Sequence, residues 1–213
     1  MGYFLGRKSE HIMVFDDAIN VDICESLMFL VDKRDGGKIL STGKTFGGQI
    51  NQAKNTLDIF LTKEKIESFG CEPNEYLKIK DEIEKSVNLC LDKYIFEFDE
   101  ISECPHLYNS GFQVGVYRKN VGYYQEHFDS AQWAPKPIDK RILAVVVYLN
   151  TVEVGGEIIF TKQNLNYSPK SGSIVIFPAS WTHPHIAKTP TSSDKWIVTT
   201  FISGKQQDSP YND

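Results

Sequence analysis

A histidine and an aspartate two residues apart, His127 and Asp129, are the first candidates for chemistry in the chain. They follow an apolar run that is typical of a β-strand. Side chains alternate between the two faces of a strand, so we expect His127 and Asp129 to share one face and Phe128 to lie on the other. An imidazole and a carboxylate on one face supply two ligands of the 2-His-1-carboxylate set, which binds Fe(II) and leaves coordination positions open. The same pair also occurs at solvated strand ends, so the interpretation requires a third ligand.

The third ligand is expected to be a histidine on a neighbouring strand. His183 and His185 come shortly after the strand-like segment 173–177, whereas His11 and His106 lie in less suitable parts of the chain. The residue pattern alone leaves both His183 and His185 open.

Lys195 is a second chemical signal, because it stands just before the apolar, strand-like segment 196–202. Alternation along that strand places Lys195 on the same face as Thr199 and Phe201. A lysine that faces the interior of a β-sandwich is unfavourable unless an anion pairs with it. We therefore expect Lys195 to bind an anionic group.

Composition excludes several classes of protein. The chain has 213 residues, 41% of them hydrophobic, and a formal net charge of -5, which argues against a nucleic-acid-binding surface. Its four cysteines show no CxxC spacing, and its N-terminus has no apolar signal core, so we expect reduced thiols and a cytoplasmic location. No apolar run approaches the roughly 20 residues that a membrane span needs.

Helical and strand-like patterns divide the chain into two parts. Helices are expected at 21–33, with Asn20 as N-cap, and at 74–94, where apolar residues form one stripe. A short strand is expected at 11–17, and 38–55 is interpreted as a loop with at most one strand. Later strands are expected at 112–118, 141–150, 157–161, 173–177 and 196–202. Several short strands over about a hundred residues favour a sandwich or barrel.

Motifs in the second part follow one another in the order Tyr117, HFD at 127–129, YLN at 148–150, GGE at 155–157, FPxxW at 177–181, a distal histidine and Lys195. This order resembles the Fe(II)/2-oxoglutarate-dependent dioxygenases, in particular their prolyl 4-hydroxylase-like branch, over residues 111–204. The resemblance implies an α+β, mainly β fold: a double-stranded β-helix (jelly roll, cupin-like) core with N-terminal packing helices. Residues 1–105 would pack on a core of 106–213 as one compact domain.

The resemblance also implies roles for individual residues. His127, Asp129 and His185 would hold Fe(II), since the family spacing of ten residues to the lysine selects His185 and leaves His183 as a supporting neighbour. Lys195 would pair with the distal carboxylate of 2-oxoglutarate, and Tyr148 and Thr199 would hydrogen-bond the same carboxylate. Tyr117 would line the 2-oxoglutarate pocket, and Tyr124 would lie near the iron on the substrate side. O2 would be the oxidant and ascorbate a stimulant. The carboxylate of Asp129 implies hydroxylation, because halogenating relatives have a small residue there.

The substrate is the least defined part of the expectation. We expect hydroxylation of an unactivated C–H bond with release of succinate and CO2, most simply on peptidyl proline; a free amino acid or other small molecule is the alternative. The loop 131–140 carries Trp133 and two prolines and is either a substrate-contacting lid or a stiff connector. A catalytically silent jelly-roll binding protein, a nucleic-acid demethylase and a Zn(II) hydrolase fit less well, the last because it leaves Lys195 unexplained.

Overall fold

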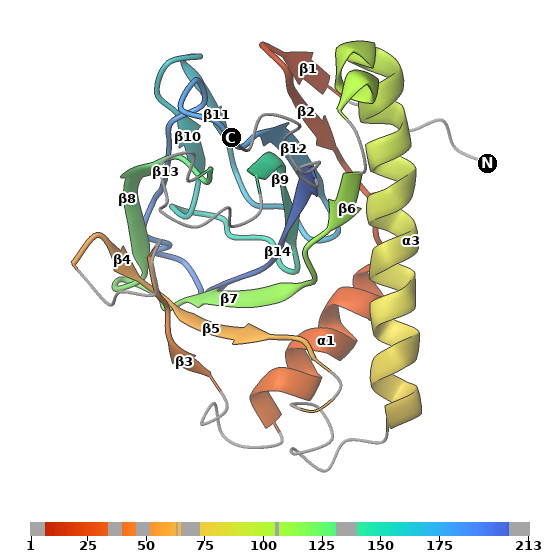
Figure 1. Cartoon of the computed structure of the whole chain (residues 1–213). Coiled ribbons are helices and arrows are strands. Elements are labelled where there is room, and N and C mark those ends of the chain that lie inside the picture. The colour runs from red at the N-terminus through yellow and green to blue at the C-terminus, as the bar shows by residue number, and fades with distance from the viewer. Residues whose placement is uncertain are drawn as a thin grey trace, which may run out of the picture.

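The computed structural model describes residues 7–33, 40–45, 52–62, 64, 73–104, 107–130 and 140–204. Within these ranges the chain forms two facing antiparallel sheets, and helices cover the outer side of the larger sheet (Figure 1).

The larger sheet has nine strands and separates the helices from the interior of the sandwich. Its order is β1 (Arg7–Ser9), β2 (Ile12–Phe15), β12 (Ile174–Pro178), β9 (Lys140–Tyr148), β14 (Lys195–Gly204), β7 (Gln113–Tyr117), β5 (Leu57–Phe60) and β3 (Ser41–Thr42), with β6 (Leu107–Asn109) also paired to β14. Strands from distant parts of the chain combine here, since β2 pairs with β12 and β5 pairs with β7.

The smaller sheet carries two of the candidate ligands. Its order is β11 (Leu165–Tyr167), β10 (Ile158–Phe160), β13 (His185–Ala187), β8 (Tyr123–His127) and β4 (Lys54–Asn55). From β7 onward the chain crosses repeatedly between the sheets: β7, β9, β12 and β14 are in the larger, and β8, β10, β11 and β13 in the smaller. This arrangement is the double-stranded β-helix that the family resemblance implies.

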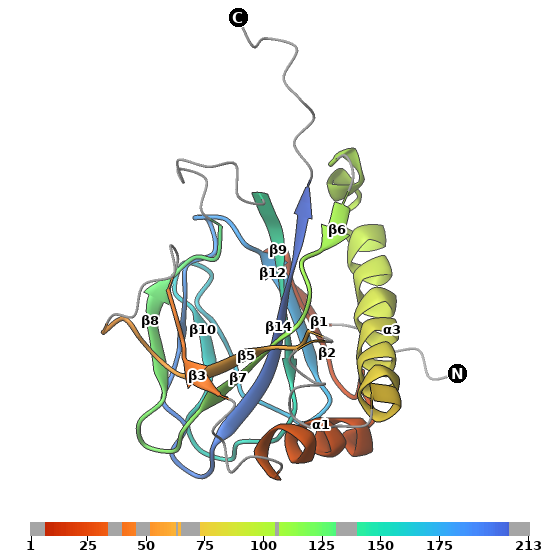
Figure 2. The same cartoon turned by 60° about the horizontal axis from the view of Figure 1, so that its bottom comes forward.

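Two helices cover the outer face of the larger sheet (Figures 1 and 2). Helix α1 spans Val21–Lys33, as expected, and begins where the side chain of Asn20 accepts a hydrogen bond of 2.9 Å from the amide of Asp22. Helix α3 spans Pro73–Glu97, a few residues longer than predicted, and a short 3-10 helix, η2, follows at Asp99–Glu103. In the part of the chain that the structure describes, no helix is both long and apolar enough to span a membrane.

Alternation along β14 divides the apolar residues into two cores. Trp196 and Val198 pack under the helices, whereas Ile197 lies in the core between the sheets with Tyr117 and Tyr148. Residues an even number of positions from Ile197, Lys195 among them, therefore face the interior of the sandwich. This confirms the expected orientation of β14.

Candidate metal centre

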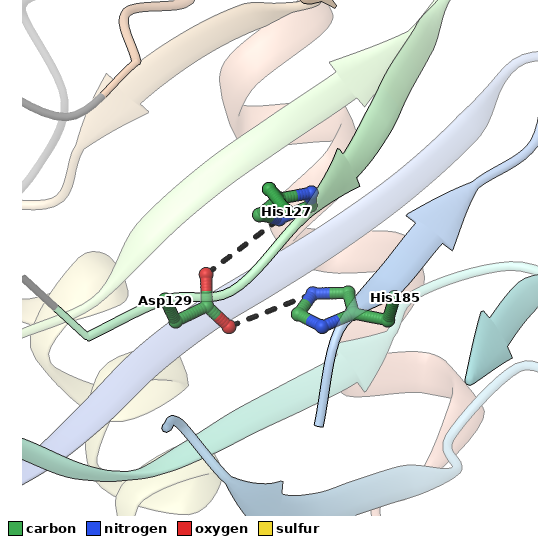
Figure 3. A group of neighbouring side chains, drawn as sticks. All are labelled: His127, Asp129 and His185. Carbon is green, nitrogen blue, oxygen red and sulfur yellow. Dashed lines mark ion pairs between the residues drawn. The ribbon is translucent and has the colours of Figure 1, made fainter. Parts of the chain in front are cut away.

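His127, Asp129 and His185 lie together between the two sheets (Figure 3). His127 ends β8, His185 begins β13, and the two are paired across these antiparallel strands. One carboxylate oxygen of Asp129 lies 3.7 Å from His127 Nε2, and the other lies 3.6 Å from His185 Nε2. The three ligand atoms all lie within 4.8 Å of one another, close enough to bind one metal ion.

Hydrogen bonds fix which nitrogen of each ring carries the proton. His127 Nδ1 lies 2.8 Å from the main-chain oxygen of Gln125, and His185 Nδ1 lies 3.1 Å from that of His183. Because a carbonyl oxygen only accepts hydrogen bonds, Nδ1 is the donor in both rings. The lone pairs of the neutral rings are then on the Nε2 atoms that face Asp129, which is the arrangement that a metal ion requires.

The surroundings of His127 favour its metal-binding form. Burial and, to a smaller extent, the neighbouring His185 lower the pKa of His127 to about 3, although Asp129 opposes the shift. A neutral imidazole can donate its lone pair to a metal, and an imidazolium cannot. The residues therefore fit the donor set of a non-haem Fe(II) site, two imidazole nitrogens and one carboxylate.

Asp129 reaches the histidines through a bend in the main chain. Strand β8 ends at His127, and the amides of Asp129 and Ser130 both donate to the carbonyl oxygen of Ala179, at 3.0 and 2.8 Å. Arg141 Nη1 donates to the carbonyl oxygen of Asp129 at 3.1 Å, a contact that sequence reasoning missed. His127 and Asp129 lie together as expected, but strand alternation is not the cause. Asp129 lies beyond the end of β8 and is held by the contacts with Ala179 and Arg141.

Tyr124 stacks on His127, with ring centroids 3.4 Å apart and planes 13° from parallel. Residues three apart on a regular strand point to opposite faces. Here the register shifts, because Tyr124 pairs with Ala187 while His127 pairs with His185. Such a bulge inserts one extra residue into β8 and brings both rings to the same face. Tyr124 therefore lies against a candidate ligand, and its role on the substrate side stays a prediction.

His183 is engaged elsewhere. Its Nε2 lies 2.8 Å from the main-chain oxygen of Glu10, and its Nδ1 lies 2.9 Å from the hydroxyl of Thr182. Both ring nitrogens therefore have partners outside the centre. Of the two histidines that the sequence left open, His185 is the one whose Nε2 faces Asp129, and His183 supports it through its main-chain carbonyl.

Lys195 is a buried cation on the inner face of β14, with 2% of its surface exposed. Its Nζ donates to the carbonyl oxygen of Gly156 at 2.9 Å and lies 3.9 Å from the ring centroid of Tyr117. Burial lowers the pKa of Lys195 to about 7, which the nearby Glu157 partly offsets. No salt bridge to Lys195 is present among the residues that the structure describes, so its charge is stabilised only in part.

The tyrosines predicted to accompany Lys195 lie on the strands beside it. Tyr117 pairs with Lys195 across β7 and β14, and Tyr148 pairs with Ile197 across β9 and β14. Burial raises the pKa of both tyrosines well above its ordinary value, so each hydroxyl keeps its proton and can donate to an anion. Thr199 lies four residues beyond Lys195, about 13 Å along the strand. That separation favours contacts with different parts of a ligand over a shared carboxylate.

A buried ion pair near Tyr124 was not predicted. Lys54 Nζ lies 2.6 Å from Asp58 Oδ2, and the hydroxyl of Thr56 donates to Asp58 Oδ1 at 2.8 Å. The same Nζ lies 5.3 Å from the ring centroid of Tyr124. Lys54 lies in a segment interpreted as loop, yet the polar residues 54, 56 and 58 alternate as in a half-buried strand and could have indicated one. Trp133 lies outside the described residues.

Comparisons with known proteins identify the class of this fold and site. Residues 112–203 match the model of the 2OG-Fe(II) oxygenase superfamily. No curated protein matches the chain. Residues 112–203 are therefore similar to a 2OG-Fe(II) oxygenase domain, which supports a dioxygenase, and this domain family implies Fe(II), 2-oxoglutarate and O2.

Solved structures with a similar fold include prolyl hydroxylases. A viral collagen prolyl hydroxylase from Paramecium Bursaria Chlorella virus-1, solved with 2OG, is 20% identical with a TM-score of 0.66, over 92% of this chain and 98% of that one. A Pseudomonas putida prolyl-4-hydroxylase is 13% identical, with a TM-score of 0.63 over 92% and 94% of the two chains. A Trichoplax adhaerens prolyl hydroxylase, solved with a hypoxia inducible factor peptide, is 15% identical, with a TM-score of 0.65 over 92% and 84%.

Proposed function

We propose that the chain hydroxylates an unactivated C–H bond, on the proline of a peptide. One oxygen atom of O2 would enter the product and the other would enter succinate, formed from 2-oxoglutarate with loss of CO2. The observation that carries the proposal is the pair of Nε2 atoms and the carboxylate of Asp129 that converge within 4.8 Å while both Nδ1 atoms are occupied.

His127, Asp129 and His185 would hold Fe(II), which supplies O2 activation when it is bound. The side chains perform the positioning. Main-chain carbonyls orient the two imidazoles, and Tyr124 covers one face of the His127 ring. Asp129 occupies its position through contacts of its main chain, so its carboxylate remains available to the metal.

Lys195 would bind the distal carboxylate of 2-oxoglutarate. Its charge is buried with one carbonyl oxygen as hydrogen-bond partner, so an incoming carboxylate would supply the missing counter-charge. The hydroxyls of Tyr117 and Tyr148 are protonated donors on neighbouring strands and would bind the same ligand. Thr199 would contact a part of the ligand nearer the metal.

Two observations support the peptidyl-proline substrate, the fold and the aromatic surfaces near the metal centre. The three similar structures carry the name of prolyl hydroxylases, and one was solved with a peptide. On this chain, Tyr124 and the stack of Arg141 on Phe201, with the guanidinium carbon 3.6 Å from the ring centroid, offer aromatic surfaces near the metal centre. A proline ring packs well on such surfaces.

The test is a mass-spectrometric screen for products that have gained one oxygen atom. Proline-containing peptides, free amino acids including proline, and a mixture of small metabolites are incubated with protein, Fe(II), 2-oxoglutarate and O2, with and without ascorbate. Hydroxylated peptide with unmodified free proline supports the proposal, and ascorbate should raise the yield. Hydroxylation confined to free amino acids or metabolites would replace peptidyl proline as the substrate.

A further inference from the structure

Three polar residues that the proposed chemistry does not use flank the pocket residues Tyr117, Tyr148 and Lys195. They are Arg118, Asn150 and Asp194, and they lie where β7 and β9 end and β14 begins. Hydrogen bonds join all three into one group, called here the Asp194 network.

The carboxylate of Asp194 connects the end of β7 to the start of β14. Its Oδ2 lies 2.6 Å from Arg118 Nη1, and its Oδ1 accepts a hydrogen bond of 2.6 Å from the amide of Lys119. Both carboxylate oxygens are therefore occupied. The carboxylate closest to Lys195 in sequence is neutralised by Arg118 and does not compete for the lysine charge.

The side chain of Asn150 connects the end of β9 to the same point. Its Nδ2 donates to the carbonyl oxygen of Asp194 at 2.9 Å, and its Oδ1 accepts from the amide of Trp196 at 2.8 Å. These two bonds hold the main chain on both sides of Lys195. The amide of Leu149 adds a third contact to the carbonyl oxygen of Trp196, at 2.9 Å.

Lys195 needs such restraint for a physical reason. Burial disfavours its charged form, so the side chain gains hydration if the first residues of β14 move outward. A strand end without flanking contacts opens locally at small cost. Contacts on both sides of Lys195 oppose that opening while no anion is bound.

We propose that the Asp194 network is the positioning device of the 2-oxoglutarate pocket: it holds Lys195 beside Tyr117 and Tyr148, and thereby sets affinity for the cosubstrate without contacting it. The inference rests on the proposed function, because it assumes that Lys195 binds 2-oxoglutarate. It assigns to Asp194, Arg118 and Asn150 a role that is separate from metal binding.

The experiment measures 2-oxoglutarate binding to protein loaded with Mn(II), which occupies an Fe(II) site without turnover. Asp194→Asn and Arg118→Gln are compared singly and together with the unmodified chain. Glu84→Gln is the matched control, because Glu84 pairs with Lys80 at 2.7 Å on α3 with similar exposure of the two side chains. Unfolding by urea is followed for every variant, and the dissociation constant for Mn(II) is measured beside that for 2-oxoglutarate.

We expect each network variant to raise the dissociation constant for 2-oxoglutarate about tenfold. The double variant should bind 2-oxoglutarate no more weakly than the single variants, because the residues act as one unit. Arg118→Lys should restore part of the affinity, Mn(II) affinity should be unchanged, and Glu84→Gln should match the unmodified chain. In the Fe(II) enzyme, KM for 2-oxoglutarate should rise more than kcat falls.

Other outcomes separate the two proposals. Dissociation constants within about twofold of the unmodified chain in both single variants would overturn the network's role. A parallel loss of Mn(II) and 2-oxoglutarate affinity would also overturn it, since that indicates general loss of structure. If Asp194→Asn does not fold, Asn150→Ala removes the other connection and is judged by the same criteria. Failure of the unmodified, metal-loaded chain to bind 2-oxoglutarate would instead remove the proposed function.

Discussion

His127 and His185 are partners across β8 and β13, with ring centroids 4.3 Å apart, and each directs Nδ1 to the carbonyl oxygen of the residue two positions before it. Main-chain carbonyl groups close in sequence therefore orient both rings. With Asp129 placed between the two Nε2 atoms, the site is organised before a metal binds.

Metal binding should distinguish His183 from His185. His185→Ala removes an Nε2 that faces Asp129 and should abolish Fe(II) binding in anaerobic calorimetry. His183→Ala leaves the carbonyl that orients His185 in place and should weaken binding by at most about 10- to 100-fold. The reverse order of the two effects would reassign the ligand to His183.

The stack of Tyr124 on His127 should contribute to metal affinity through packing. Tyr124→Phe keeps the ring and should leave the Fe(II) dissociation constant unchanged. Tyr124→Ala removes a contact worth about 0.5–1.5 kcal/mol and should weaken binding by roughly two- to tenfold. Equal effects of the two substitutions would point to the hydroxyl and contradict a packing role.

Lys195 should destabilise the ligand-free protein, although it is needed to bind 2-oxoglutarate. Lys195→Met replaces a buried, incompletely paired cation with an apolar side chain of similar length. We expect the free energy of unfolding in urea at pH 7 to rise by about 1–4 kcal/mol, together with loss of 2-oxoglutarate binding. A large loss of stability would show that Lys195 is structural instead.

Affinity for 2-oxoglutarate should depend on pH through Lys195. The pKa of Lys195 in the ligand-free protein is lowered to about 7, and a bound carboxylate raises it, so binding takes up a proton. Affinity should be constant below about pH 7 and fall on the order of tenfold per pH unit above it, until the pKa of the bound state is reached. Lys195→Arg, which stays charged, should lose this dependence. An unmodified chain with a flat profile to about pH 9 would contradict this linkage.

Local sequence patterns predicted part of the framework around the site, although the ligand-bearing strands β8 and β13 were not among the predicted segments. Asn20 and the apolar spacing after it marked α1 at its observed bounds, and parity along β14 placed Lys195 inside. The grouping of His127, Asp129 and His185 followed from a resemblance in motif order, and the structure brings these three side chains together. Such signals are local or depend on spacing, so a single sequence contains them.

Long-range pairing was outside the reach of the sequence. The bulge that turns Tyr124 toward His127 arises from register with β13, and the bend at Asp129 depends on Ala179 and Arg141. Likewise, β5 joins β7 from a segment that precedes a long helix. Periodicity reports which face of an element is apolar but carries no information on which distant strand it meets.

Oxidative decarboxylation of 2-oxoglutarate tests the central claim most directly. Purified protein is incubated with Fe(II), O2 and 2-oxoglutarate, and succinate is measured in the presence and absence of each component and in Asp129→Ala. We predict slow succinate formation without a primary substrate, dependent on all three components and absent from the variant. No succinate, together with no thermal stabilisation by 2-oxoglutarate of the metal-loaded protein, would contradict the assignment.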